Sequence, residues 1–80
     1  MRLKKDKDIE ELKQFGFKYG PRDTIVYKTK CHGVESRIYI DLLPCHNNNN
    51  EIKVETPSVT IPEKILNKLY DIIEAGLIEK

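Results

Sequence analysis

Hydrophobic positions alternate with polar ones along the middle of the chain, and this period predicts β-structure. In the runs 24–31 and 34–43, β-branched and aromatic residues alternate with charged ones, and His32-Gly33 separates the runs. Alternation interrupted by a short Gly-containing break predicts a β-hairpin. A shorter run at 51–56 alternates in the same way and predicts a third strand.

The length of the break sets the register of the predicted hairpin. With His32 and Gly33 as a two-residue turn, apolar residues face one another on one side of the sheet and charged residues on the other. The facing pairs are then Tyr27 with Ile38, Ile25 with Ile40, and Lys30 with Glu35. A three-residue loop would move apolar residues onto the wet face, so we expect the two-residue turn.

Two segments repeat their apolar residues with the helical period. The first, 8–15, is amphipathic and is followed by Gly16, which suits a left-handed helix end. The second begins near 60–63, ends at Gly76 and carries seven apolar residues within an arc of roughly 160°. These seven are Ile65, Leu66, Leu69, Tyr70, Ile72, Ile73 and Leu77. We expect the sheet to bury the whole arc.

Together these elements predict an α+β fold in one small domain spanning 1–80, with 1–5 as a flexible tail. The expected order is α-β-β-β-α: a three-stranded antiparallel meander with both helices on one face, in two layers. A chain of 80 residues buries only a small core. Its stability is therefore expected to be marginal, and self-association is one expected means of support.

Charge and targeting signals narrow the picture further. The net charge is +1, with +4 in residues 1–40 and −3 in residues 41–80, so the total indicates no particular partner. The first residues lack the apolar core of a secretory signal, and no apolar run is long enough to span a membrane. We expect a cytoplasmic protein with no membrane partner, whose two cysteines are free thiols.

Two adjacent pairs, Cys31-His32 and Cys45-His46, raise the question of a zinc site. The predicted strand between them is about 30 Å long, which keeps the pairs too far apart for a shared ion or for a disulfide. Known zinc sites also favour about two to four residues between paired ligands. The sequence therefore predicts no metal and no cofactor.

No constellation in the sequence is typical of a catalytic site. A catalytic Cys/His pair must share a face, whereas neighbours in an extended chain point to opposite faces. Asp41 and Asp71 are the best isolated carboxylates, and both are expected to be solvated. Glycine-rich phosphate loops and dinucleotide fingerprints are absent. We expect no enzyme and no catalytic residues; a pocket holding Cys31 or Cys45 beside a carboxylate would reverse this.

The sheet face that the helices leave open is the candidate interaction surface. In the expected register it carries Lys28, Lys30, Arg37, Tyr39 and Lys53. A tyrosine among cations resembles a stacking platform for single-stranded RNA, and a basic N-terminal arm could extend it onto phosphates. That arm comprises Arg2, Lys4, Lys5 and Lys7. Four acidic residues interleave with the cations, so an ordinary solvated face and a protein-binding face remain alternatives.

The Asn-, Ile- and Lys-heavy composition resembles that of small uncharacterised proteins of AT-rich Gram-positive bacteria and their prophages. That resemblance rests on composition and implies an accessory or regulatory role. Residues 63–80 also look like the end of a winged helix-turn-helix, in which a helix and a Gly-Leu-Ile step lead into the wing. Strands rather than helices precede this segment, and Asp71 and Glu74 fall on the face that would read DNA.

The leading interpretation is a non-enzymatic binding module. It would act through contacts with an unknown protein partner, or with itself as a homodimer, using the open sheet face or an unpaired strand edge. The alternative is a nucleic-acid-binding or regulatory protein that uses the basic sheet face and the N-terminal arm. Binding of that second kind must weaken steeply with salt.

Overall fold

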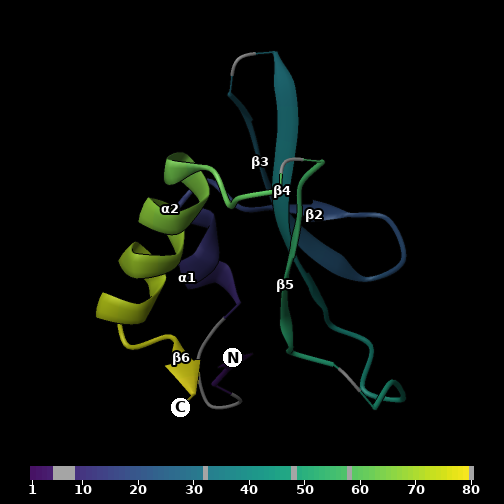
Figure 1. Ribbon diagram of the computed structural model, residues 1–80. Coiled ribbons are helices and arrows are strands. Elements are labelled where there is room, and N and C mark those ends of the chain that lie inside the picture. Colours follow the sequence, from purple (N-terminus) through teal and green to yellow (C-terminus); the bar gives the residue numbers. More distant parts are fainter. Residues whose placement is uncertain (5–8, 32, 48, 58, 80) are drawn as a thin grey trace.

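A computed structural model describes residues 1–4, 9–31, 33–47, 49–57 and 59–79, without the side chain of Cys31. The fold is α+β, and its strands and helices follow one another through the chain (Figure 1). They are β1 (Arg2–Leu3), α1 (Glu10–Lys13), β2 (Lys18–Gly20), β3 (Thr24–Cys31), β4 (Val34–Asp41), β5 (Ile52–Glu55), α2 (Glu63–Glu74) and β6 (Ile78–Glu79).

The main sheet is an antiparallel meander of four strands in the order β2-β3-β4-β5. The predicted hairpin register is confirmed, because β3 and β4 pair through Tyr27 and Ile38 and continue to Cys31 opposite Val34. The expected third strand is β5, which pairs with β4. The predicted count of three strands was wrong. β2, which precedes the turn at Pro21, pairs with β3 and adds a fourth strand.

The N-terminal residues 1–4 are part of a sheet, whereas the sequence had predicted a flexible tail over 1–5. β1 pairs with β6 from the far end of the chain. On its other side the Leu3 N–H donates to the carbonyl of Asn50 over 2.8 Å, and the Ile52 N–H donates to the carbonyl of Met1 over 3.0 Å. The side chain of Leu3 is buried in the core. This strand therefore joins β6 to the start of β5.

Both helices lie on the same side of the main sheet, as predicted (Figure 1). Each ends in a Schellman motif, in which a glycine adopts positive φ and the next residue bonds back to the last turn. Gly16 has φ 90° and Gly76 has φ 75°; the Leu77 N–H donates to the Ile72 carbonyl over 3.2 Å. The buried core between helices and sheet comprises Leu3, Leu12, Phe17, Ile25, Ile38, Ile40, Ile65, Ile72, Leu77 and Ile78.

The apolar arc of α2 is only partly buried, which corrects the expectation that the sheet covers all of it. Ile65 and Ile72 are completely enclosed. Leu66, Tyr70 and Ile73, on the neighbouring side of the same arc, keep 37%, 61% and 36% of their surface exposed. A helix resting on one sheet face can bury only the part of its surface that points at the sheet. The rest of the arc faces solvent.

Candidate interaction surface

The five residues predicted for the interaction surface lie on the helix-free face of the main sheet. Across the strands Lys28 is opposite Arg37, and Tyr39 is opposite Lys53. Lys30 lies nearer the hairpin end, opposite Glu35. Because residues that face one another across a sheet point to the same side, the register brings all five together.

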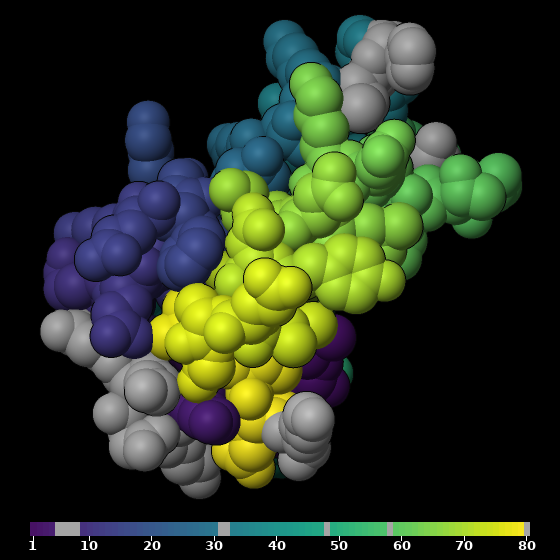
Figure 2. All heavy atoms as spheres, turned by 90° about the vertical axis from the view of Figure 1, so that its left-hand side faces the viewer, coloured from purple at the N-terminus to yellow at the C-terminus, as the bar shows by residue number. Residues whose placement is uncertain are grey.

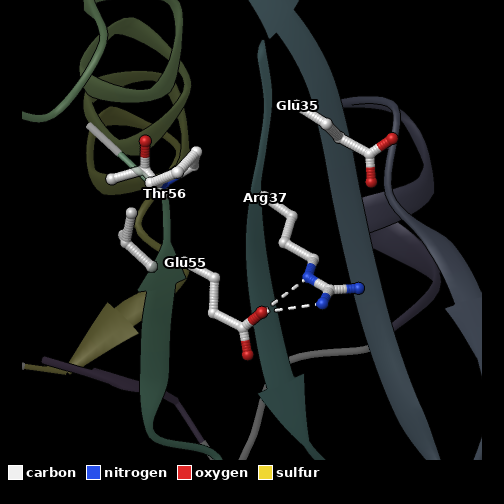
Figure 3. Close-up of a pocket in the computed structure, with 6 residues that line it drawn as sticks. Glu35, Arg37, Glu55 and Thr56 are labelled. Atoms are coloured by element: carbon white, nitrogen blue, oxygen red, sulfur yellow. Dashed lines mark hydrogen bonds and ion pairs between the residues drawn. The ribbon is translucent and has the colours of Figure 1, made fainter.

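Arg37 is held in place by an ion pair across the β4–β5 ladder. Its Nε and Nη2 atoms each lie 2.8 Å from Oε2 of Glu55 (Figure 3). Both side chains remain nearly half exposed, so the pair contributes little to stability. Its effect is to fix the direction of the guanidinium and to neutralise it in part. The pair lines a hollow together with Glu35, Val54, Thr56 and Pro57.

Two further hollows indent the same face and share Pro21, Val26 and Arg37, so they are adjacent. One is completed by Arg22, Thr24, Tyr39 and Glu55. The other is completed by Gly16, Lys18, Tyr19, Gly20 and Lys28. Their rims therefore combine four cationic side chains with one carboxylate, and that carboxylate is already paired with Arg37.

Lys18 and Arg22 are residues of this surface that the sequence analysis missed, because it did not recognise β2. The signal was present. Gly20-Pro21 is a dipeptide typical of turns, and it precedes the run 24–31. In the structure the residues on the two sides of this turn pair, Gly20 with Thr24 and Lys18 with Val26. Gly20 fits this hairpin because a Cβ there would lie 2.9 Å from Oγ1 of Thr24 and 3.1 Å from a methyl of Val26.

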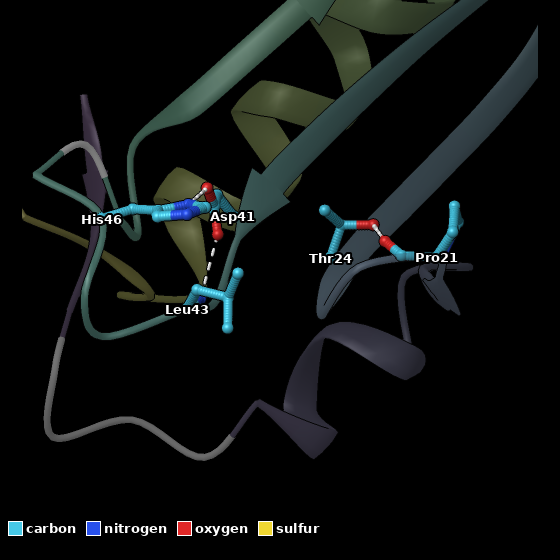
Figure 4. Close-up of polar contacts among 5 residues, drawn as sticks. All are labelled: Pro21, Thr24, Asp41, Leu43 and His46. Carbon is cyan, nitrogen blue, oxygen red and sulfur yellow. Dashed lines mark hydrogen bonds and ion pairs between the residues drawn. The ribbon is translucent and has the colours of Figure 1, made fainter.

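The turn that carries Arg22 is strained. Arg22 and Asp23 have φ of 57° and 53°, a left-handed conformation that costs an arginine about 1–2 kcal/mol. The hydroxyl of Thr24 donates to the carbonyl of Pro21 over 2.8 Å and closes the turn (Figure 4). Residues with a strained backbone cluster at functional sites. Here the strained turn sets Arg22 on the rim of a hollow.

A polar cluster of Glu10, Lys13 and Tyr19 connects β2 to α1. The Tyr19 hydroxyl donates to Oε1 of Glu10 over 3.2 Å, and Nζ of Lys13 lies 2.9 Å from the other carboxylate oxygen. Lys13 also stands 4.6 Å from the centre of the Tyr19 ring. The hydrogen bond from Lys13, and then that from Tyr19, lowers the pKa of Glu10. These contacts hold the edge strand against the helix layer.

Asp41 has partners, which corrects the expectation that it is merely solvated. Its Oδ1 accepts from the Leu43 N–H over 2.9 Å, and Oδ2 accepts from Nδ1 of His46 (Figure 4). The His46 bond, followed by the Leu43 bond, lowers the pKa of the Asp41 carboxyl. This arrangement anchors the loop after β4. Asp71 likewise has a neighbour, with Nζ of Lys68 4.0 Å from its carboxylate.

Cys45 is an exposed free thiol and lines none of the hollows described above. His32, from the other Cys-His pair, lies outside the described residues.

Within the part of the chain that the structure describes, no three His, Cys, Asp or Glu side chains gather as metal ligands. Nor does any helix in those same ranges have the length and apolar character to cross a bilayer.

Comparisons with known proteins identify no relative of the chain. No family model, no curated protein and no solved structure matches the chain.

Proposed function

We propose that the chain is a non-enzymatic binding module that acts through protein contacts, and that its open sheet face receives an acidic segment of the partner. The observation that carries this proposal is the pair of adjacent hollows whose rims hold four cations and one already paired carboxylate. Tyr39 and Val26 provide the apolar part of the same surface. Tyrosine and arginine around an apolar floor are typical of protein interfaces.

One contact favours a protein over a nucleic acid as the partner. The side chain of Arg2 donates to the carbonyls of Asn47 and Asn49, each over 3.4 Å, so it is not a free arm. The expected arm also included Lys4, Lys5 and Lys7. Of these, Lys5 and Lys7 lie outside the described residues.

Affinity capture from the protein's own cells tests the proposal. The tagged chain is immobilised, nuclease is added, and the recovered proteins are identified and then titrated against purified variants. Lys28→Glu on the open face is expected to weaken the partner's binding by about tenfold or more. The matched control is Lys64→Glu, the same substitution on α2, and it should leave binding unchanged. A partner that binds Lys28→Glu and Tyr39→Ala as well as it binds the wild type contradicts this surface.

A second candidate function is single-stranded nucleic-acid binding. It is favoured by Tyr39, which faces Lys53 across the sheet and shares a hollow with Arg22 and Arg37. Bases could stack on such a ring while the cations contact the backbone. Fluorescence anisotropy with a labelled oligonucleotide over a range of salt tests it, because each lost phosphate contact lowers the slope by about 0.7. A flat salt response removes this candidate.

A further inference from the structure

The outer side of α2 carries an apolar stripe that the described part of the molecule leaves partly exposed. Leu66, Tyr70 and Ile73 have the spacing i, i+4, i+7 and lie within about 60° of one another around the helix. Scattered exposed apolar residues are normal, whereas a contiguous group marks a contact site. Figure 2 shows α2 in the middle of this face, beside the N-terminal residues at its C-terminal end. The stripe belongs to a surface distinct from the open sheet face.

The two ends of this stripe differ in shape. Before α2 stand two protruding aliphatic side chains: Val59 is fully exposed, and Ile61 is 44% exposed. Ile61 also has the spacing of a hydrophobic staple to Leu66, which places it at that end of the stripe. At the other end lies a hollow of about 660 Å³, lined by Met1, Lys4, Ile73, Gly76, Ile78 and Glu79. Such a volume can accept side chains from a partner.

We propose that α2 is the dimer interface between two copies of this chain, packed antiparallel about a two-fold axis near Tyr70. A two-fold contact requires a surface that is its own complement. Reversing α2 about that axis brings the protruding Val59 and Ile61 of one copy over the apolar hollow of the other, and does so twice. In the middle, Leu66 meets Ile73 of the second copy, and the two Tyr70 rings lie beside each other.

Charges at the ends of α2 support the same arrangement. In the antiparallel register Glu63 comes opposite Gly76 of the second copy, where the hollow is lined by Lys4, which can pair with Glu63, and also by Glu79, from which Glu63 must stay apart. Glu74 comes alongside Asn67 of the second copy, whose amide can donate to it. The helix dipoles also oppose each other, which is favourable. A parallel arrangement would instead bring Val59 and Ile61 of one copy against the same residues of the other. It would also bring the two Glu63 carboxylates together.

Sedimentation equilibrium of the full chain tests the proposal. The wild type is expected to associate to a dimer. Tyr70→Lys should weaken the dimer by about thirtyfold or more, since it puts two cations at the axis in place of two rings. Tyr70 is outside the core, so circular dichroism should stay unchanged. The matched control, Asp71→Lys, introduces the same residue about 100° further round the same helix, away from Leu66 and Ile73, and should leave the dimer intact.

A charge exchange tests the antiparallel register independently. Glu63→Lys and Lys4→Glu should each weaken the dimer, and the double variant should restore it. A strictly monomeric wild type at sub-millimolar concentration overturns the proposal, and so does a dimer that Tyr70→Lys leaves unchanged. Failure of the double variant to restore association also overturns the arrangement. None of these outcomes depends on the sheet face, so the proposed function stands or falls separately.

Discussion

At the scale of single residues, Asp41 couples loop structure to pH. Its carboxyl has an ordinary pKa of 3.8, which the His46 and Leu43 hydrogen bonds lower in the folded chain. The stability that these bonds provide is complete above the ordinary value, and it is lost as the pH falls through the lowered one. Asp41→Asn removes that titration, so the free energy of unfolding is expected to fall less steeply below about pH 4.

Urea unfolding followed over a range of acidic pH checks this prediction. His46→Ala removes the larger of the two hydrogen bonds to Asp41 and keeps the Leu43 bond, so its acid dependence should lie between those of the wild type and Asp41→Asn. If Asp41→Asn retains the acid dependence of the wild type, the carboxyl does not anchor the loop.

Arg22 illustrates a conflict between stability and binding at one position. Its φ of 57° suits glycine, and Arg22→Gly should relieve the left-handed strain at the cost of a more flexible unfolded chain. The balance is a gain of about 0.5–1 kcal/mol in the free energy of unfolding. The same variant removes a cationic side chain from a hollow of the open sheet face, so it should weaken binding of the partner. Thermal unfolding and partner titration, run in parallel, check the two effects; loss of stability would show that the turn is not strained.

At the scale of elements, the short strand β1 carries more of the fold than its length suggests. Leu3 keeps only 2% of its surface exposed and joins the central core. Leu3→Ala is therefore expected to lower the free energy of unfolding by about 2–4 kcal/mol, through lost burial and the cavity left behind. The control Arg2→Ala, on the exposed side of the same strand, should change it by no more than about 0.5 kcal/mol. A flexible tail would give no effect for either variant.

The long elements could be predicted because each contains its own periodic signal. In the hairpin, apolar and polar residues largely alternate along two eight-residue strands, and a register slip of one residue would expose Ile25 or bury Lys30. Gly76 marks the end of α2 through its backbone alone. By contrast β1 and β6 are two residues each, too short to show a period. They exist because opposite ends of the chain meet beside Asn50, a contact that local sequence does not encode.

The candidate surfaces were predictable to a similar extent. Lys28, Arg37 and Tyr39 followed from the hairpin register, since register decides which side chains share a face. Arg22 was missed because its place on the face depends on a turn between two strands, one of which was unrecognised. The stripe on α2 was seen as apolar but assigned to the core. Sequence gives the width of an apolar arc, whereas the tilt of the helix on the sheet decides how much of it stays exposed.

At the scale of the whole molecule, the two proposed surfaces lie on opposite layers. The helices occupy one side of the main sheet (Figure 1). The basic hollows are lined by residues of the other side. A dimer formed through α2 would therefore leave two open sheet faces pointing outward. Such an assembly would bind two acidic segments at once and would gain affinity from the second contact without any new residue. The two proposals thereby assign assembly and recognition to separate layers of the fold.

Dimerisation should also make the stability of the chain depend on its concentration. Folded dimer and unfolded monomer are linked by mass action, so a tenfold rise in concentration adds about 1.4 kcal/mol for each dimer, or half of that for each chain. For a domain of this size that raises the melting temperature by roughly 3–5 °C. The melting temperature of Tyr70→Lys should not change with concentration below the dissociation constant of its weakened dimer, because there it unfolds as a monomer. Melting curves recorded over two decades of concentration check this, and a wild-type melting temperature that does not move would mean that the outer side of α2 adds nothing to the fold.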